Sequence, residues 1–383
     1  MNPKNCNSVY IHIPFCSNIC NYCDFCKMYY NEKLVDDYLQ ELNKEIKTNY
    51  KNETLSTIYI GGGTPSCLNI EQLSKLFNIT SKLNLNNKYE FTIEMNINDI
   101  TEEKLKLFKE NKVNRISIGI ETLNDKYLTI LNRKHTKEEV IAKLKLAKRY
   151  FNNINIDLMY AFPKETLKDL DKDLSFIKEI DVPHVSIYSL IIEEHTKLFI
   201  DKTTPIDDEL ESKMYYHIIE HLKNLGYNHY EISNFSKEGY ESRHNLTYWN
   251  NLEYYGFGLG SSGYINNIRY TNTRSINNYL KGNYILEKTL IDTKTKMENF
   301  MMLGLRKTEG ISKKEFKDIF SSTISENFDI INLLDKKLLI DDNEYLKIPE
   351  NLLYIENSIL VNFIDGGGND WFTYSYNSFR WNR

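Results

Sequence analysis

The chain has 383 residues, of which 41% are hydrophobic and 26% charged, and its formal net charge is −5. It is long enough to bury a large core and to form more than one domain. The near-neutral charge gives no electrostatic basis for binding nucleic acid. No apolar run approaches the length of a membrane span, no signal-peptide pattern stands at the start, and the six cysteines form no disulfide framework. We therefore expect a cytoplasmic protein without a transmembrane segment.

Short apolar strands alternate with helices through the first half of the chain. The spacing of Leu34, Tyr38 and Leu42, for example, predicts a helix over residues 32–48. The predicted strands cover residues 8–13, 57–60, 90–94, 115–120, 154–159 and 185–190. The predicted helices cover residues 32–48, 70–83, 102–110, 125–131, 137–150 and 167–180.

Six such βα repeats predict an α/β fold, an open partial (β/α)6 barrel with helices on its outer face. In barrels of this type the chemistry lies at the carboxyl ends of the strands. A cysteine cluster follows the first predicted strand, and a glycine loop follows the second. Glu94, Glu121 and Asp157 lie at or near the ends of the third, fourth and fifth. The pattern therefore predicts a single site at this edge of the sheet.

The second half of the chain has a different pattern. A helix is predicted over residues 208–225, and from residue 292 onward the sequence is mostly helical. Two apolar runs, residues 337–340 and 346–348, flank a DDNE turn and predict a hairpin. We predict four parts: the barrel over residues 1–206, an extension over 207–290, a mostly helical, winged-helix-like module over 291–364, and a disordered or atypical tail over 365–383.

Cys16, Cys20, Cys23 and Cys26 stand within eleven residues on a predicted loop. Thiolates gathered this closely are typical of a metal site or an iron–sulfur cluster. The first three have C-x3-C-x2-C spacing, and three ligands on a cluster that needs four leave one iron open for a small molecule. A structural zinc site is an alternative, although no second ligand pair follows downstream. A ferredoxin-type cluster is another, although the Cys-Pro of that motif is absent.

The loop Gly61-Gly62-Gly63-Thr64-Pro65 follows the second predicted strand. Glycines expose backbone groups and permit positive φ, so a ligand can approach the main chain closely. A tight βα turn explains the same residues. Beside the cysteines, the loop is placed to meet the ammonium of an amino-acid-like ligand that chelates the open iron.

Tyr10, Cys16, Cys20, Tyr22 and Cys23, together with GGGTP, resemble the radical S-adenosylmethionine (SAM) enzymes. More narrowly, the chain resembles the oxygen-independent coproporphyrinogen III oxidase family over nearly its whole length. The matching segments, in order, are IHIPFC, GGGTPS, IEMN, NRISIGIETL, LNRKH, IDLMYAFP and HVSIYSL. The later segments YEISNF, HNLTYW and LGLRKTEG resemble its heme-chaperone branch, the HemW-type proteins.

The resemblance implies roles for individual residues. Cys16, Cys20 and Cys23 would hold a [4Fe–4S] cluster. SAM carries an ammonium, a carboxylate, a sulfonium and ribose hydroxyls. Carboxylates and an arginine gathered at the carboxyl ends of the strands, the mouth of the barrel, would therefore find groups of opposite charge on this ligand. Ordinary charges at the barrel rim are the alternative. The positions that would line the SAM site are Tyr10, Tyr22, Gly62, Gly63, Thr64, Glu94, Glu121, Arg133 and Asp157.

This chain has Glu121 where the family has a glutamine. A glutamine side chain both donates and accepts hydrogen bonds, whereas an ionised glutamate only accepts. Glu121 can therefore keep a contact to a ribose hydroxyl, but it would reject a carboxylate.

His244, in the segment HNLTYW, is the candidate heme ligand, with Tyr248 and Trp249 against the macrocycle. A core histidine with one hydrogen bond explains the same pattern. Weaker candidates for the heme ligand are His135, His184, His195 and His229.

The resemblance implies a protein that binds heme as cargo and passes it to an acceptor protein, with an electron-donor protein reducing the cluster. The main alternative is an oxygen-independent coproporphyrinogen III oxidase, which consumes SAM to decarboxylate two propionates. True oxidases carry a fourth cysteine at the position of Phe25; here Cys26 lies one step later and is either a free thiol or a ligand. A plain iron–sulfur electron carrier, which would need neither the glycine loop nor the barrel, is a third reading.

Overall fold

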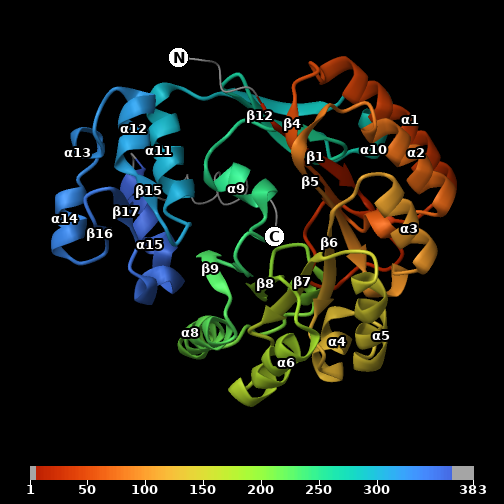
Figure 1. Ribbon diagram of the computed structural model, residues 1–383, viewed down its shortest axis with the longest axis horizontal. Helices are drawn as coiled ribbons and strands as arrows, with labels where there is room; N and C mark the ends of the chain where they lie inside the picture. Colours follow the sequence, from red (N-terminus) through yellow and green to blue (C-terminus); the bar gives the residue numbers. More distant parts are fainter. Residues whose placement is uncertain (1–5, 365–383) are drawn as a thin grey trace. The chain divides into compact units, whose positions relative to one another are not determined.

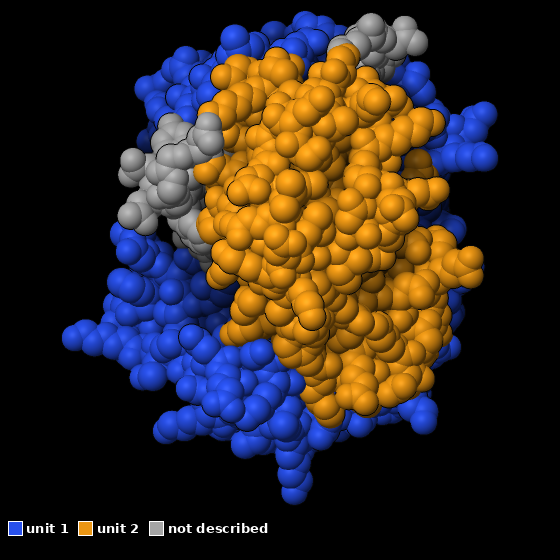
Figure 2. Space-filling model, turned by 90° about the vertical axis from the view of Figure 1, so that its left-hand side faces the viewer, with its two compact units in different colours: residues 1–214, 253–290 blue, residues 215–252, 291–383 orange. Residues whose placement is uncertain are grey.

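The structure is a computed structural model that describes residues 6–364. The chain divides into two compact units, which are coloured separately in Figure 2. Unit 1 comprises Met1–Met214 with Glu253–Leu290, and unit 2 comprises Tyr215–Leu252 with Ile291–Arg383. The two units share the residues of the predicted extension, so the four-part division stays a prediction. The predicted tail over residues 365–383 lies outside the described residues.

In unit 1, parallel strands pair in the order β11-β1-β4-β5-β6-β7-β8, and β1 and β4 to β8 are labelled in Figure 1. Six of these strands alternate with helices, which confirms the predicted α/β partial barrel. The strand β11 pairs with β1 and is not indicated by the sequence, because three residues beside glycines carry too little periodicity. The strands are β1 (Ser8–Ile13), β4 (Leu55–Gly62), β5 (Leu85–Asn96), β6 (Arg115–Glu121), β7 (Asn153–Tyr160), β8 (His184–Ser189) and β11 (Tyr255–Phe257).

Helices α1 to α6 lie along the outer side of this curved sheet (Figure 1). An Asn or Thr side chain caps the start of each one, which satisfies a backbone donor that the first turn leaves without a partner. Two of them, α2 and α5, end two to three residues earlier than predicted. The helices are α1 (Glu32–Asn49), α2 (Ile70–Thr80), α3 (Glu102–Glu110), α4 (Asp125–Leu131), α5 (Lys137–Lys148) and α6 (Leu167–Ile180).

The two faces of the sheet differ in chemistry. On the outer face Phe91 of β5 packs against Phe77 of α2, which also meets Phe108 of α3, at ring-centroid distances of 6.3 and 5.5 Å. On the inner face the alternate residues are polar, and the strand register sets Tyr10 beside Tyr59. Strands that are buried on both faces normally read as continuous apolar runs. A polar inner face therefore indicates an interior built to hold a polar ligand.

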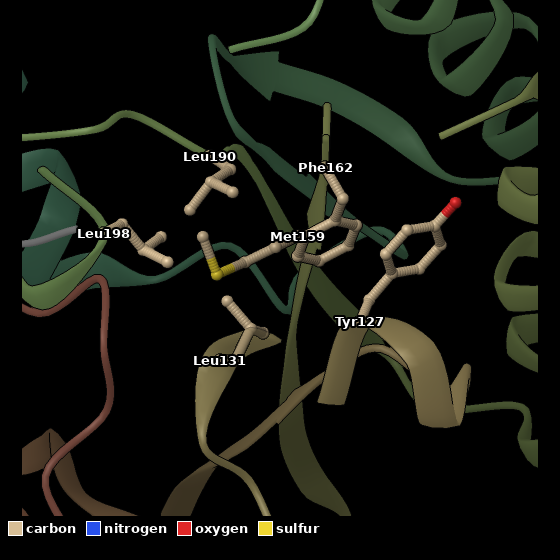
Figure 3. Packing of buried hydrophobic residues seen from close by; sticks show 6 residues of the cluster. All are labelled: Tyr127, Leu131, Met159, Phe162, Leu190 and Leu198. Atoms are coloured by element: carbon tan, nitrogen blue, oxygen red, sulfur yellow. The ribbon is translucent and has the colours of Figure 1, made fainter. Parts of the chain in front are cut away.

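An apolar cluster joins the loops at the carboxyl ends of the strands (Figure 3). Tyr127 of α4 and Phe162, which follows β7, stack with ring centroids 4.7 Å apart. Tyr22 of the cysteine loop packs against this cluster, so the cluster helps to hold that loop in place. Its buried members are Tyr127, Leu131, Met159, Phe162, Leu190 and Leu198, the last from α7 (Lys197–Ile200).

Unit 1 also contains an antiparallel sheet of the strands β12, β13 and β14. The hydrogen-bonded order places β13 between the other two. These strands are β12 (Ser262–Ile265), β13 (Ile268–Asn272) and β14 (Ile285–Leu290), with α10 (Ile276–Tyr279) between the last two.

Unit 2 is mostly helical, as the sequence predicts for the C-terminal part. The predicted hairpin forms between β16 and β17, with Ile340 opposite Lys347, although its first strand begins at the end of the predicted run. No helix in the described ranges is long and apolar enough to cross a membrane. The elements are α8 (Asp208–Asn224, which begins in unit 1), β9 (Asn228–Glu231), β10 (Asn234–Ser236), α9 (Arg243–Trp249), α11 (Thr293–Gly304), β15 (Ile311–Ser312), α12 (Lys313–Phe320), α13 (Ile324–Asn327), α14 (Ile330–Asp335), β16 (Ile340–Asp341), β17 (Tyr345–Lys347) and α15 (Glu356–Leu360).

Candidate functional site

The cysteine loop leaves the end of β1 and is held at both its base and its middle. At the base, β2 (Phe15–Cys16) pairs in parallel with β3 (Met28–Tyr29). In the middle, Asn21 donates its backbone N–H to the oxygen of Leu131 at 3.1 Å and its side-chain amide to the oxygen of Ile130 at 2.8 Å. Because these carbonyls belong to the last turn of α4, the loop caps that helix end.

The three thiols of the motif are all free and lie within electrostatic reach of one another. Burial raises the pKa of Cys16, Cys20 and Cys23, the last to about 12, and the neighbouring thiols raise that of Cys23 further. Lys27 and Arg133 oppose the shift at Cys16 and Cys20. Among the described residues no three His, Cys, Asp or Glu side chains converge on a single metal ion. A [4Fe–4S] cluster binds thiolates at separate irons, and three free cysteines on one loop are a donor set that fits it.

The glycine loop packs directly against the base of the cysteine loop. Gly63 donates its N–H to the oxygen of Ile13, and Thr64 donates to that of Phe15, both at 2.8 Å. The Thr64 hydroxyl reaches the sulfur of Cys16 at 3.6 Å. A Cβ on Gly63 would lie 2.8 Å from the Phe15 oxygen and 3.0 Å from the Cys16 sulfur. Only glycine leaves the backbone room to come this close to a cluster ligand.

His12 lies under the same loop and connects it to Cys26. Its Nε2 is 2.7 Å from the backbone oxygen of Cys26, and its Nδ1 is 3.0 Å from the hydroxyl of Tyr10. A carbonyl only accepts, so Nε2 carries the proton and Nδ1 accepts from the tyrosine. Burial lowers the pKa of His12 to about 4, so the ring is neutral. Gly62 has φ +117°, and a Cβ there would meet this ring at 2.7 Å.

Glu94, on β5, accepts hydrogen bonds from two neighbouring groups of the mouth. The Gly62 N–H donates to one carboxylate oxygen at 3.1 Å, and the Tyr59 hydroxyl donates to the other at 2.8 Å. Burial, with a contribution from Asp157 and Glu121, raises the pKa of Glu94 to about 8. Three carboxylates that influence one another in a buried mouth complement a cationic ligand, such as one with an ammonium and a sulfonium.

Arg133 is the cation that pairs with Glu121. Its Nη2 donates to the carboxylate of Glu121, the last residue of β6, and contacts the Tyr22 hydroxyl at 3.4 Å. Both side chains of the ion pair are buried, with 11% and 7% exposed. Burial opposes the charge of Arg133, but Glu121, Tyr22 and Cys20 together raise its pKa well above the usual value. Its Nε atom has no hydrogen-bond partner in the described structure.

Asp157, on β7, lies at the centre of a hydrogen-bond network across three strands. Ser117 donates to one carboxylate oxygen at 3.0 Å, and Asn155 donates to the other at 2.8 Å. His184 of β8 contacts Asn155 through Nδ1 at 2.6 Å. Burial raises the pKa of Asp157, and these hydrogen bonds oppose the shift. The buried Arg115 also favours the ionised carboxylate.

His244 lies in unit 2, at the second position of α9, and is fully buried. Its Nε2 is 2.7 Å from the hydroxyl of Tyr248, one helical turn away. This geometry is that of a core histidine, and the role of His244 as a heme ligand stays a prediction. The weaker candidates for the heme ligand have different surroundings. His135 and His184 are buried in unit 1, His195 is exposed, and His229 stacks on Phe235.

The structure brings together, in unit 1, the three cysteines and all nine positions predicted to line the SAM site, through the contacts given above. Their roles toward a cofactor stay predictions. Sequence reasoning missed Tyr59, Ser117, Asn155 and His12, which complete the network. A signal for them was available: polar residues at alternate positions within otherwise apolar parallel strands.

Comparison with known proteins identifies the class of protein to which this chain belongs. Residues 10–177 match the Radical SAM superfamily, and residues 291–351 match the HemN C-terminal domain. The solved structure of coproporphyrinogen III oxidase (HemN) from Escherichia coli, described as a radical SAM enzyme, has a TM-score of 0.83 with 20% identity. The match covers 94% of this chain and 90% of that one, and it establishes a common fold. With this fold and site, the chain is a radical SAM-type protein.

Relatives at higher identity define the family within that class. Heme chaperone HemW of Lactococcus lactis is 39% identical over 371 residues, which cover 94% of this chain and 97% of the relative. The Bacillus subtilis HemW is 39% identical over 88% of this chain and 93% of its own, and that of Escherichia coli is 30% identical over 93% and 98%. The chain belongs to the HemW family.

Proposed function

We propose that this protein binds a [4Fe–4S] cluster through Cys16, Cys20 and Cys23, binds SAM beside it, and carries heme to an acceptor protein. The observation that carries the proposal is its 39% identity, over 94% of the chain, to a protein named heme chaperone HemW. The free thiols beside the glycine loop support the cofactor part. Cluster and SAM would together supply one-electron chemistry, with the electron coming from a donor protein.

Different residues of the proposed SAM site would contact different groups of the ligand. Glu94 and backbone carbonyl groups of the glycine loop would hold the ammonium, because no cation among residues 6–364 pairs with this carboxylate, which accepts from the Gly62 N–H. Arg133 is the proposed partner of a ligand carboxylate. Asp157 adds a negative charge from deeper in the barrel, where it favours the sulfonium. Tyr10 and Tyr22 close the sides of the mouth and reduce the access of water.

The cofactor proposal is tested by anaerobic reconstitution with iron and sulfide. We expect the broad absorption of a [4Fe–4S] cluster and a change in its electron paramagnetic resonance spectrum when SAM is added. Replacing Cys16, Cys20 and Cys23 together by Ser would abolish the cluster, whereas Cys6→Ser, at a buried cysteine outside the motif, would keep it. Equal cluster iron in the two variants would contradict the assignment.

The cargo proposal is tested with the reconstituted protein and two ligands. We expect heme to bind at one per chain and coproporphyrinogen III to remain unconverted in the presence of SAM and a reductant. Formation of protoporphyrinogen would instead establish the oxidase alternative. The fold likeness to coproporphyrinogen III oxidase supports that alternative only weakly, and Phe25 stands where the oxidases carry a cysteine.

His244 is the proposed heme ligand. Ligation would require its ring to leave the Tyr248 hydroxyl, since Nε2 is 2.7 Å from that oxygen. His244→Ala would then weaken heme binding about tenfold or more. His229→Ala, which also removes a buried imidazole from unit 2, is the matched control and would leave the affinity unchanged. Equal heme affinity in the His244 variant would remove this residue from the site.

A further inference from the structure

The ion pair between Glu121 and Arg133 lies within the proposed SAM site. Arg133 directs one guanidinium nitrogen at the Glu121 carboxylate and contacts the Tyr22 hydroxyl with the same nitrogen. Both charges are almost fully buried. In a buried site each charge depends on its partner, because water does not compensate for a lost contact.

The backbone around Glu121 is shaped to bring its side chain to Arg133. Glu121 has φ +67°, which is uncommon for a residue with a side chain, and the register between β6 and β7 shifts between Gly119 and Glu121. A Cβ on Gly119 would lie 2.9 Å from the Glu121 carboxylate and 3.2 Å from the Arg133 guanidinium. The glycine therefore leaves the space that the ion pair occupies.

This contact changes what Arg133 offers to a ligand. A guanidinium that pairs with a ligand carboxylate usually does so with two parallel hydrogen bonds. Here a carboxylate of the chain itself already takes Nη2, and a second carboxylate at the same group would add the repulsion of two like charges in a buried mouth. Nε is buried and has no hydrogen-bond partner in the described structure, so Glu121 leaves part of the guanidinium group available to a ligand.

We propose that Glu121 determines the specificity of this site: its carboxylate stands in for a ligand carboxylate on Arg133, so that the mouth discriminates against the carboxylate of SAM. The inference rests on the proposed function, since it concerns the same SAM site. A ligand with the ammonium, sulfonium and adenosine of SAM but without its carboxylate fits the mouth with Glu121 in place. SAM itself must displace Glu121 from Arg133.

Two ligands and one substitution isolate this effect. The probes are SAM and decarboxylated SAM, which differ only in the carboxylate, measured by equilibrium dialysis against the anaerobically reconstituted protein. Glu121→Gln removes the negative charge at nearly constant shape. We expect this variant to bind SAM about tenfold or more tightly than the native chain does, and decarboxylated SAM with less than about a twofold change.

Variants of Arg133 supply the matched control. In an Arg133→Met background the guanidinium is absent, so Glu121→Gln would no longer improve the affinity for SAM over that for decarboxylated SAM. Glu121→Ala is a second way to free Arg133, and we expect the same preference for SAM from it. Circular dichroism and urea unfolding of each variant report whether it is folded at the temperature of the binding measurement.

Unchanged SAM affinity in both Glu121 variants would overturn the proposal. An equal loss of affinity for both ligands would also overturn it, because Glu121 would then be a direct contact of the shared adenosine or ammonium. Failure of the heme-chaperone proposal is a separate result, since it would show as absent heme binding and leave the ratio of the two affinities unaffected.

Discussion

Arg115 and Arg133 are both buried in unit 1, but their guanidinium groups have different surroundings. Arg133 pairs with Glu121. Arg115 is 2% exposed, its Nε has no hydrogen-bond partner, and no ion pair of Arg115 is found within residues 6–364. Its neighbours in register, Thr92 and Asn153, also have buried oxygens without a partner. Ordered water is the simplest group that would satisfy three such atoms.

Because of this difference, we expect two similar substitutions to lower the free energy of unfolding by different amounts. Arg133→Met would strand the buried carboxylate of Glu121 and cost about 3 kcal/mol of folding free energy. Arg115→Met would remove a cation that makes no ion pair within residues 6–364 but favours the ionised Asp157 carboxylate, and we expect a smaller cost of about 1 kcal/mol. Urea unfolding at neutral pH measures both. A larger cost at Arg115 than at Arg133 would show that Arg115 has a partner that the described contacts do not include.

Two glycines with positive φ separate the effect of backbone strain from that of steric contact. Gly62 has φ +117°, and an added Cβ would meet the His12 ring at 2.7 Å. Gly226 has φ +80°, and an added Cβ would meet nothing within 4 Å. Both positions carry the conformational cost of a side chain at positive φ, which is about 1 kcal/mol.

We therefore expect Gly226→Ala to lower the free energy of unfolding by about 1 kcal/mol and to leave cluster and SAM binding intact. Gly62→Ala would cost more, because the His12 ring or the loop must move. It would also weaken SAM binding, since the Gly62 N–H would leave Glu94. Unfolding and SAM titration of the two variants test this. Equal behaviour would mean that the glycine loop is only a turn.

At the scale of elements, Glu45 joins helix α1 to the segment that runs from β11 to α10. The Gly258 N–H donates to it at 2.8 Å, Asn272 at 2.6 Å and the Tyr279 hydroxyl at 2.5 Å. More than 200 positions of the chain separate Glu45 from each donor. Burial nevertheless raises the pKa of Glu45 to about 7, against these hydrogen bonds.

The shift at Glu45 predicts a pH-dependent contribution to stability. A carboxyl group with a raised pKa in the folded state favours folding fully below its ordinary value near 4.5, and that contribution is lost as the pH rises through about 7. Relative to Glu45→Gln, the native chain would therefore lose on the order of 3 kcal/mol between these pH values. Urea unfolding at several pH values measures the difference. A difference that grows in favour of the native chain with rising pH would contradict the assignment.

Across the whole molecule, buried carboxyl groups with raised pKa occur in both units. Burial raises the pKa of Glu165 to about 8, Asp173 to about 6 and, in unit 2, Glu231 to about 7. Burial shifts the pKa of an imidazole in the opposite direction, and it lowers the pKa of His12 and His229 to about 4. Their contribution is present above the ordinary value near 6.5 and is lost as the pH falls toward 4.

The raised carboxyl groups outnumber the two lowered imidazoles, so the two sets together predict maximum stability near pH 4.5. Between about pH 4.5 and 8 the unfolded chain releases the carboxyl protons that the folded chain keeps, and the stability lost in this way exceeds what the two imidazoles contribute. The urea midpoint, measured from pH 4 to 9, would pass through this maximum. Because burial causes the shifts, 0.5 M salt would change the position of the maximum little. A midpoint that rises steadily to pH 8 would contradict this account.

The strand-and-helix order was predictable because periodicity is local. An apolar strand and an amphipathic helix each show their pattern within about ten residues, so all six βα repeats could be read directly. The length of β5 and the existence of β11 could not. The first extends over residues 85–89, whose side chains are half-buried or exposed, and the second is a strand only because β1 lies beside it.

The amino-acid sequence alone determined the order of the βα repeats, the cysteine spacing and the placement of polar residues after the strands, since each depends on neighbours in the chain. Only the tertiary structure decided that Arg133 meets Glu121 and Tyr22, the latter 111 positions away, that His12 packs under Gly62, and that His244 is fully buried. Such contacts follow from how strands close into a barrel and how side chains pack, and no local pattern encodes which two distant side chains meet.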